Sequence, residues 1–249
     1  MRSGNPALNE KTFRNYYTET AGSANAMTVQ GTAWKTLILL GMCAGTACFT
    51  WTRVANGEMA SAMPLIFGGA IGGLIAGLAT SFKPTWAPVT APIYALLQGL
   101  FLGGISAIFE QTEYKGIALQ AIAATFGTMF ALLLAYQSGF IRATENFKLG
   151  VFAATGGIAM LYLVSFVLSF FGMPLSFINE PSWLGIGFSV FVVIIAALNL
   201  VLDFDFIENA ANNGAPKYME WYGAYGLMVT LVWLYIEILR LLSKLNSRD

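Results

Sequence analysis

The chain has 249 residues, of which 57% are hydrophobic and 10% charged. Soluble domains carry about 25% charged residues, so this composition excludes an ordinary soluble domain and predicts an all-α, polytopic membrane protein. The 13 basic and 13 acidic residues balance, which leaves no basic surface for nucleic acid, and we expect no nucleic-acid partner.

The potential metal ligands are few. Cys43 and Cys48 lie five residues apart in the first apolar stretch, on different faces of one expected helix, so a disulfide between them is geometrically unreasonable. Histidine is absent, and a bound cation would therefore be held by oxygen, which suits calcium, magnesium or protons. We expect no tightly bound cofactor and no enzyme activity, because neither a nucleophile–base pair nor a phosphate-binding loop is present.

Residues 1–32 are polar and rich in Asn, Thr, Ser and Gly. They lack the apolar stretch that a secretory signal needs, so we expect a polar cytoplasmic tail followed by a membrane domain over residues 33–249. This domain contains seven apolar stretches of about 20 residues, the length that a bilayer core demands. The expected spans are 33–52, 63–82, 89–109, 116–136, 149–171, 183–202 and 220–242.

Seven crossings put the chain ends on opposite sides, and the bias of Lys and Arg indicates which side is cytoplasmic. Eight basic residues fall on the side of the N-terminal tail and five on the other side, which favours a cytoplasmic N-terminus. The cluster Arg240, Lys244 and Arg248 conflicts with this orientation. Six spans plus a re-entrant segment would leave both ends inside, and that alternative stays open.

Small residues recur at four-residue spacing in the second span, which permits close packing of helices. They form two neighbouring stripes, Gly68, Gly72 and Ala76, and Gly69, Gly73 and Gly77. In the third span, Gln98 is either an interhelical hydrogen-bonding residue or part of a polar path. With Glu220, it is a candidate pore-lining residue.

The sixth span ends in three carboxylates within six residues. Asp203 follows Asn199 by four residues, so the two share one face of a continuing helix. Asp205 points to the other side and pairs by spacing with Glu208. One acid therefore faces inward and two face outward, and all four residues are candidates for an ion path or a pH sensor.

The last span carries its own polar stripe, in which Thr230 and Glu237 recur at helical spacing. An intramembrane carboxylate is a functional candidate by default, although a structural pair of Glu237 with Arg240 explains it equally well. Glu237 lies 17 residues past Glu220, about 25 Å along a helix. Asp203 and Glu237 are then too far apart to touch. They would instead be two polar sites at opposite ends of one ion path through the bundle.

Three stretches together resemble one family. Residues 202–208 (LDFDFIE), 94–103 (YALLQGLFLG) and 234–242 (LYIEILRLL) are similar to motifs of the Bax inhibitor-1, or transmembrane Bax inhibitor motif, family. The opening residues 2–8 resemble its bacterial YccA-like branch. This resemblance covers nearly the whole chain and implies a location in the bacterial inner membrane.

The resemblance also implies a seven-helix bundle with the last helix at its centre, and a pH-sensitive calcium leak. In that family an aspartate ending the sixth helix shares a proton with an aspartate of the seventh. Asp203 matches the first, whereas alignment on residues 239–242 puts Thr230 at the position of the second. Other acids would have to substitute for it, the candidates being Asp205, Glu208, Glu220 and Glu237.

Burial between apolar helices disfavours the ionised form of a carboxylate, so Asp203 can sense protons without histidine. Protonated, Asp203 would hydrogen-bond to a neighbouring helix and close the cytoplasmic opening of the ion path. Ionised, it would attract a divalent cation. Calcium takes six to eight oxygens, so Asn199, backbone carbonyls, water or a second acid must join Asp203 as ligands.

Two functions therefore remain. The preferred one is a passive, pH-modulated calcium leak whose partners are the lipid bilayer and calcium or protons. The alternative is a non-conducting regulator that binds another membrane protein, such as a membrane protease, through its tail and its small-residue helix faces.

Overall fold

The computed structural model describes residues 26–173, 175, 178 and 180–247. In this part of the chain seven helices are long and apolar enough to cross a membrane, which confirms the predicted all-α membrane fold. They are α2 (Val29–Ala55), α3 (Met59–Phe82), α4 (Ala87–Thr112), α5 (Ile117–Gln137), α6 (Glu145–Phe170), α8 (Trp183–Asn212) and α9 (Met219–Asn246). A short 3-10 turn, η1 (Pro84–Trp86), leads into α4.

Hydroxyl side chains fix where three helices begin. Thr28, Thr144 and Ser182 each accept a hydrogen bond from the backbone N–H three residues further on, at the starts of α2, α6 and α8. Because Thr28 caps α2, that helix begins at Val29, four residues before the expected first span. At its other end α8 runs through the acidic stretch to Asn212, so the three carboxylates lie on regular helix.

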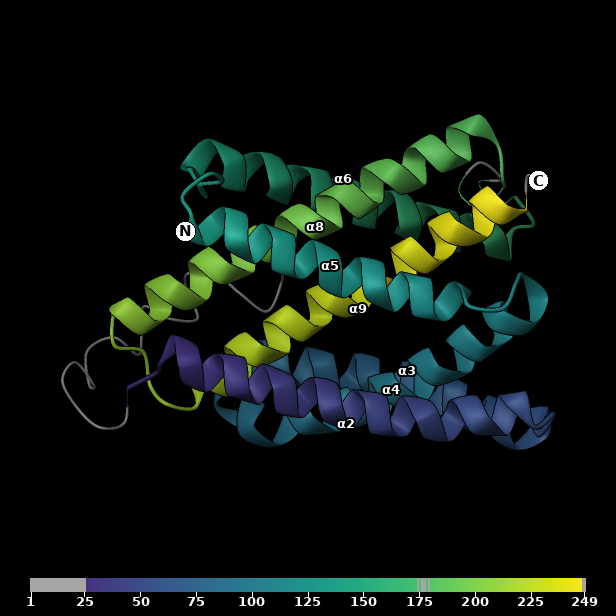
Figure 1. The fold of residues 1–249 in the computed structure, drawn as a ribbon, viewed down its shortest axis with the longest axis horizontal. Helices are drawn as coiled ribbons and strands as arrows, with labels where there is room; N and C mark the ends of the chain where they lie inside the picture. The colour runs from purple at the N-terminus through teal and green to yellow at the C-terminus, as the bar shows by residue number, and fades with distance from the viewer. Residues whose placement is uncertain (1–25, 174, 176–177, 179, 248–249) are drawn as a thin grey trace.

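The last helix lies at the centre of the bundle. In Figure 1, α9 crosses between a group formed by α2, α3 and α4 and a group formed by α5, α6 and α8. It packs against α2, α4, α5 and α8. Of its most apolar stretch 61% is buried, against 11–44% for the other six helices. Polar side chains on α9 therefore face protein instead of lipid.

Close packing of α3 on α4 depends mainly on one of the two small-residue stripes, although a Cβ atom at Gly72 of the other stripe would also lie 3.2 Å from Leu97. A Cβ atom at Gly69 would lie 2.6 Å from the backbone oxygen of Leu97, and one at Gly73 would lie 2.9 Å from Nε2 of Gln98. By contrast, a Cβ atom at Gly68 would meet nothing within 4 Å. The stripe of Gly69, Gly73 and Gly77 is thus buried in this helix contact.

We expect Gly69→Ala to lower the stability of the folded protein by about 1–3 kcal/mol, because the added methyl group clashes with backbone atoms that cannot move independently. Gly68→Ala is the matched control, since it makes the same change of helix propensity in open space. Thermal melting of both variants in detergent measures the difference. Equal melting temperatures would contradict this account of the α3–α4 contact.

Candidate functional site

The inward-facing carboxylate of α8 meets a hydroxyl group of α9. Asp203 is fully buried, and its Oδ2 accepts a hydrogen bond of 2.5 Å from Oγ1 of Thr230, which is 3% exposed. One turn earlier, the Nδ2 of Asn199 donates to Thr155 of α6 and to its own helix at Ile195, each at 2.8 Å. The amide nitrogen of Asn199 is thus directed to α6, while Asp203 joins α8 to the central helix.

The two outer carboxylates of α8 take separate partners. Asp205 lies 2.9 Å from the ammonium of Lys148, at the first turns of α6. Glu208 accepts a 2.6 Å hydrogen bond from the hydroxyl of Tyr136, near the end of α5. Asp205 and Glu208, which the spacing suggested as a pair, therefore make separate contacts. These contacts connect the end of α8 to α6 and to α5.

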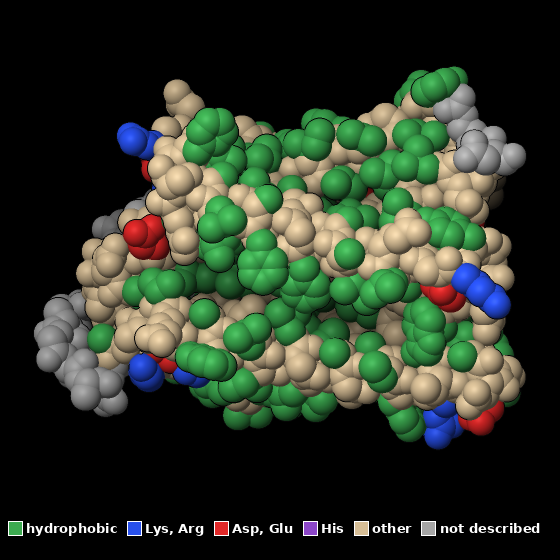
Figure 2. Space-filling model, in the orientation of Figure 1, with side chains coloured by type: hydrophobic (Ala, Val, Ile, Leu, Met, Phe, Trp, Pro, Cys, Tyr) green, Lys and Arg blue, Asp and Glu red, His purple; other side chains and the backbone are tan. Residues whose placement is uncertain are grey.

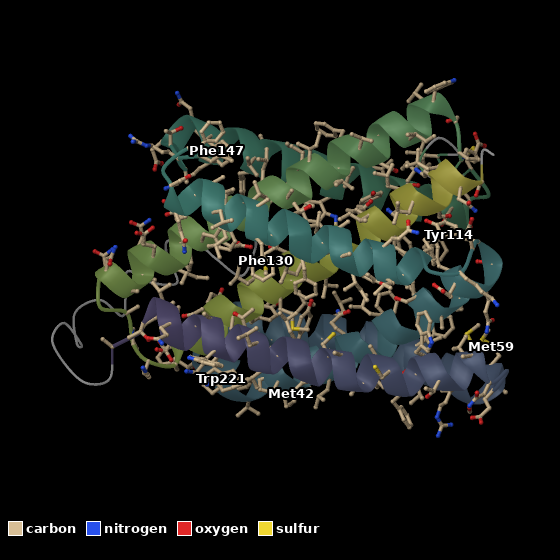
Figure 3. All side chains as sticks on the ribbon, viewed as in Figure 1. Met42, Met59, Tyr114, Phe130, Phe147 and Trp221 are labelled. Atoms are coloured by element: carbon tan, nitrogen blue, oxygen red, sulfur yellow. The ribbon has the colours of Figure 1, made fainter. Side chains whose placement is uncertain are left out.

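Asp205 and Glu208 also line a cavity of about 870 Å³ flanked by α2 and α5. Figure 2 shows it as a hollow whose walls are mostly hydrophobic, and Phe130 of α5, labelled in Figure 3, belongs to its lining. The carboxylates lie toward the end of the cavity where α5 ends. An apolar hollow with acidic groups at one end thus adjoins the Asp203 region.

Glu220 lies at the same end of the bundle, in the first turn of α9, and is fully buried. Its carboxylate accepts hydrogen bonds from the backbone N–H and the hydroxyl of Thr28, at 3.0 and 2.8 Å. It also forms ion pairs with Lys35 and, at 2.8 Å, with Lys217. Glu220, expected as a pore-lining residue, fixes the start of α2 against the start of α9.

At the opposite end of α9, Glu237 is 2% exposed and pairs with Arg240 at 3.0 Å. The hydroxyl of Tyr162 donates to the same carboxylate at 3.0 Å and accepts from Arg240 at 2.8 Å. Glu237 follows Thr230 by two helical turns, about 10 Å. Asp203 and Glu237 thus have different partners and lie at different depths. At Glu237, the pair with Arg240 that the spacing suggested is present.

A comparison of the sequence with models of known families identifies the family. A sequence model described as Bax inhibitor 1 like matches residues 5–247. The chain belongs to this family. A comparison with curated proteins gives no match. The family match spans all seven helices, so it covers the bundle and every carboxylate described above.

Thr230, which the resemblance placed at the position of a second aspartate, is the residue that donates a hydrogen bond to Asp203 across the contact between α8 and α9. The other acids do not replace that second aspartate there, because Asp205, Glu208, Glu220 and Glu237 each bond to the partners given above.

Among the described residues, no group of three or more His, Cys, Asp or Glu side chains comes together to hold a metal ion. Asp203 and Thr230 contribute one carboxylate and one hydroxyl to their contact, fewer than the six to eight oxygens of a resident calcium site.

The remaining predicted residues have structural contacts. Gln98 is half-buried at the contact with Gly73 of α3, and its Oε1 is buried without a hydrogen-bond partner among the residues that the structure describes. Cys43 is buried, Cys48 is exposed, and both are free thiols, as the spacing predicted.

Sequence reasoning missed Lys148 and Tyr162 as partners of the acids, and it missed the burial of Lys244. The Nζ of Lys244 donates to the backbone oxygens of Ile178 and Gly185 and to Ser189. The available signal was general: a buried carboxylate needs a cation or a donor. That signal does not say which distant residue supplies it.

We expect Glu220→Gln to destabilise the bundle by about 1.5–3 kcal/mol, the range for hydrogen bonds to charged groups. The amide cannot pair with both Lys35 and Lys217, so the starts of α2 and α9 lose their charged link. Glu58→Gln is the control, because it removes an exposed pair with Arg53 of the kind worth about 0–1 kcal/mol. Thermal melting in detergent compares the two variants. Similar losses of melting temperature would show that Glu220 does not stabilise the contact between α2 and α9 more than an exposed ion pair does.

Proposed function

We propose that this protein is a passive, pH-sensitive leak for cations, with calcium as the ion, and that Asp203 controls it. The observation that carries the proposal is the complete burial of the Asp203 carboxylate against Thr230, between α8 and the central helix. An ionisable side chain buried within a membrane-spanning bundle is a functional candidate by default.

The control follows from the charge of Asp203. At low pH the neutral acid shares a hydrogen bond with Thr230, and the two helices stay together. At higher pH the ionised acid attracts water and a cation, which separates α8 from α9. Protons thus hold the path closed, and flux rises with pH.

The ends of the path have different electrostatics. Lys148 neutralises Asp205, whereas Glu208 is exposed, with a neutral tyrosine as its hydrogen-bond donor, and attracts cations to the mouth. At the far end the Glu237–Arg240 pair lies in the bundle and has to rearrange for an ion to pass. This cost suits a slow leak better than a fast channel.

We further propose that the Asp203 end faces the cytoplasm of a bacterial cell, with the membrane domain in the inner membrane. Lys35, Lys83, Arg142, Lys148 and Lys217 lie at this end, and the excess of Lys and Arg marks the cytoplasmic side. A cysteine placed by Lys217→Cys should react with a membrane-impermeant thiol reagent in inverted vesicles and not in intact cells. The reverse pattern would overturn the orientation.

The alternative is a non-conducting regulator of another membrane protein. Residues 1–25 of the expected tail (1–32) lie outside the described residues, and the stripe of Gly69, Gly73 and Gly77 is occupied by α4. Absence of calcium flux from purified protein in liposomes, at every pH, would favour this alternative over the leak.

We expect Asp203→Asn to make calcium flux into liposomes independent of pH and as low as that of the unchanged protein at acidic pH. The amide keeps the shape and hydrogen bonding of the protonated acid without its charge. Glu58→Gln, at an exposed site, should retain the original pH profile. A normal profile in the Asp203 variant would remove Asp203 as the sensor.

We expect Thr230→Asp to move the opening transition to higher pH. Two carboxylates in contact resist double ionisation, so a higher pH is needed to charge both, whereas the unchanged protein should show one shallow transition. Thr230→Val, which removes one hydrogen bond and adds no charge, is the control and should leave the midpoint nearly unchanged. Flux against pH measures all three, and a midpoint shared by the Asp variant and the unchanged protein would contradict the gate.

A further inference from the structure

The cavity flanked by α2 and α5 is open to the side of the bundle, as the hollow in Figure 2 shows. We call it the lateral groove. Leu37 of α2 and Phe130 of α5 belong to its lining and are 58% and 57% exposed, whereas Thr36 and Leu227 are buried at 7% and 8%. In a membrane its opening faces lipid acyl chains.

The depth of the lateral groove matches one leaflet. Its lining residues on α2 run from Val29 to Leu40, which is about 16 Å at a rise of 1.5 Å per residue. The hydrocarbon core of a bilayer is about 30 Å thick. The groove therefore extends from the membrane surface to about the midplane, the depth that one acyl chain reaches.

Three charged side chains line the outer end of the lateral groove, Arg142, Asp205 and Glu208. Asp205 pairs with Lys148, whereas Arg142 and Glu208 are exposed. Glu208 accepts a hydrogen bond from Tyr136, and the guanidinium of Arg142 has no ion pair with a carboxylate of the described residues. A guanidinium binds phosphate oxygens by charge-assisted hydrogen bonds, and a carboxylate accepts them from an ammonium group.

We propose that the lateral groove binds a phospholipid with an amine headgroup. One acyl chain fills the groove, the phosphate contacts Arg142, and the ammonium contacts Glu208. The apolar walls, the leaflet depth and the pair of charges each match one part of such a lipid. The bound chain lies between α2 and α5, and the headgroup lies at the outer end of the groove beside Glu208. This binding does not depend on whether the protein conducts ions.

The test uses the full chain in liposomes that contain phosphatidylethanolamine with a photoactivatable group on the acyl chain. Mass spectrometry of the cross-linked peptides then reports which residues the chain touches. We expect labelling of Thr36 and Leu227, which are too buried for surface lipid, in addition to Ile71 of α3, which is 60% exposed and serves as the reference for lipid at the surface.

Two substitutions separate the groove from the general lipid surface. Ala33→Trp places a bulky ring in the lateral groove and should lower labelling of Leu227 several-fold, while Ala123→Trp, at an exposed position of α5 outside the lining, should not. Arg142→Gln should also lower it several-fold, with Lys83→Gln at the same end of the bundle as its control. Labelling of Ile71 should stay constant in all of them.

Because Arg142 lies on an exposed connection, its variant tests the proposal even if Ala33→Trp does not fold. Unchanged labelling of Leu227 in Arg142→Gln, or labelling no stronger in the unchanged protein than in a folded Ala33→Trp variant, would overturn the proposal. Phosphatidylglycerol carrying the same photoactivatable chain should label Leu227 less than phosphatidylethanolamine. Equal labelling would overturn the contact between Glu208 and the ammonium.

Discussion

A carboxylate within the hydrocarbon region of a membrane has to be met by groups of the protein, because lipid chains offer neither hydrogen bonds nor counter-charges. The structure meets this constraint by surrounding α9 with the other helices. Glu220 and Glu237 of this helix, and Asp203 that reaches it from α8, are all at most 2% exposed. Had α9 lain at the edge of the bundle, part of this polar stripe would face lipid.

The three buried carboxylates of the bundle are held in different ways. Glu220 and Glu237 each form an ion pair, which links α9 to α2 at one end and, through Tyr162, to α6 at the other. Between them, Asp203 meets the hydroxyl of Thr230. The proposed change of charge at Asp203 acts on this contact between α8 and α9.

The sequence allowed the helices to be predicted better than their contacts. Seven spans follow from the apolar stretches, and the approach of Thr230 to Asp203 follows from family alignment. The partners of the acids do not follow, because Lys35 and Glu220 are 185 residues apart and no periodic pattern connects them. The lateral groove could not be predicted from the sequence either. It depends on how α2 and α5, which are separated by two helices in the chain, are spaced around α9.

The contacts of the C-terminal basic residues bear on the direction of the chain through the membrane. Arg240 and Lys244 were counted as loop charges in conflict with a cytoplasmic N-terminus. Arg240 is instead paired with Glu237, and Lys244 is 3% exposed and bonded to backbone oxygens near the start of α8. The same holds at the other end of the bundle, where Lys35 and Lys217 pair with Glu220 and Lys148 pairs with Asp205. Arg248, the third residue of the C-terminal cluster, lies outside the described residues. The seven helices that are long enough to cross a membrane place the beginning of α2 and the end of α9 at opposite ends of the bundle (Figure 1).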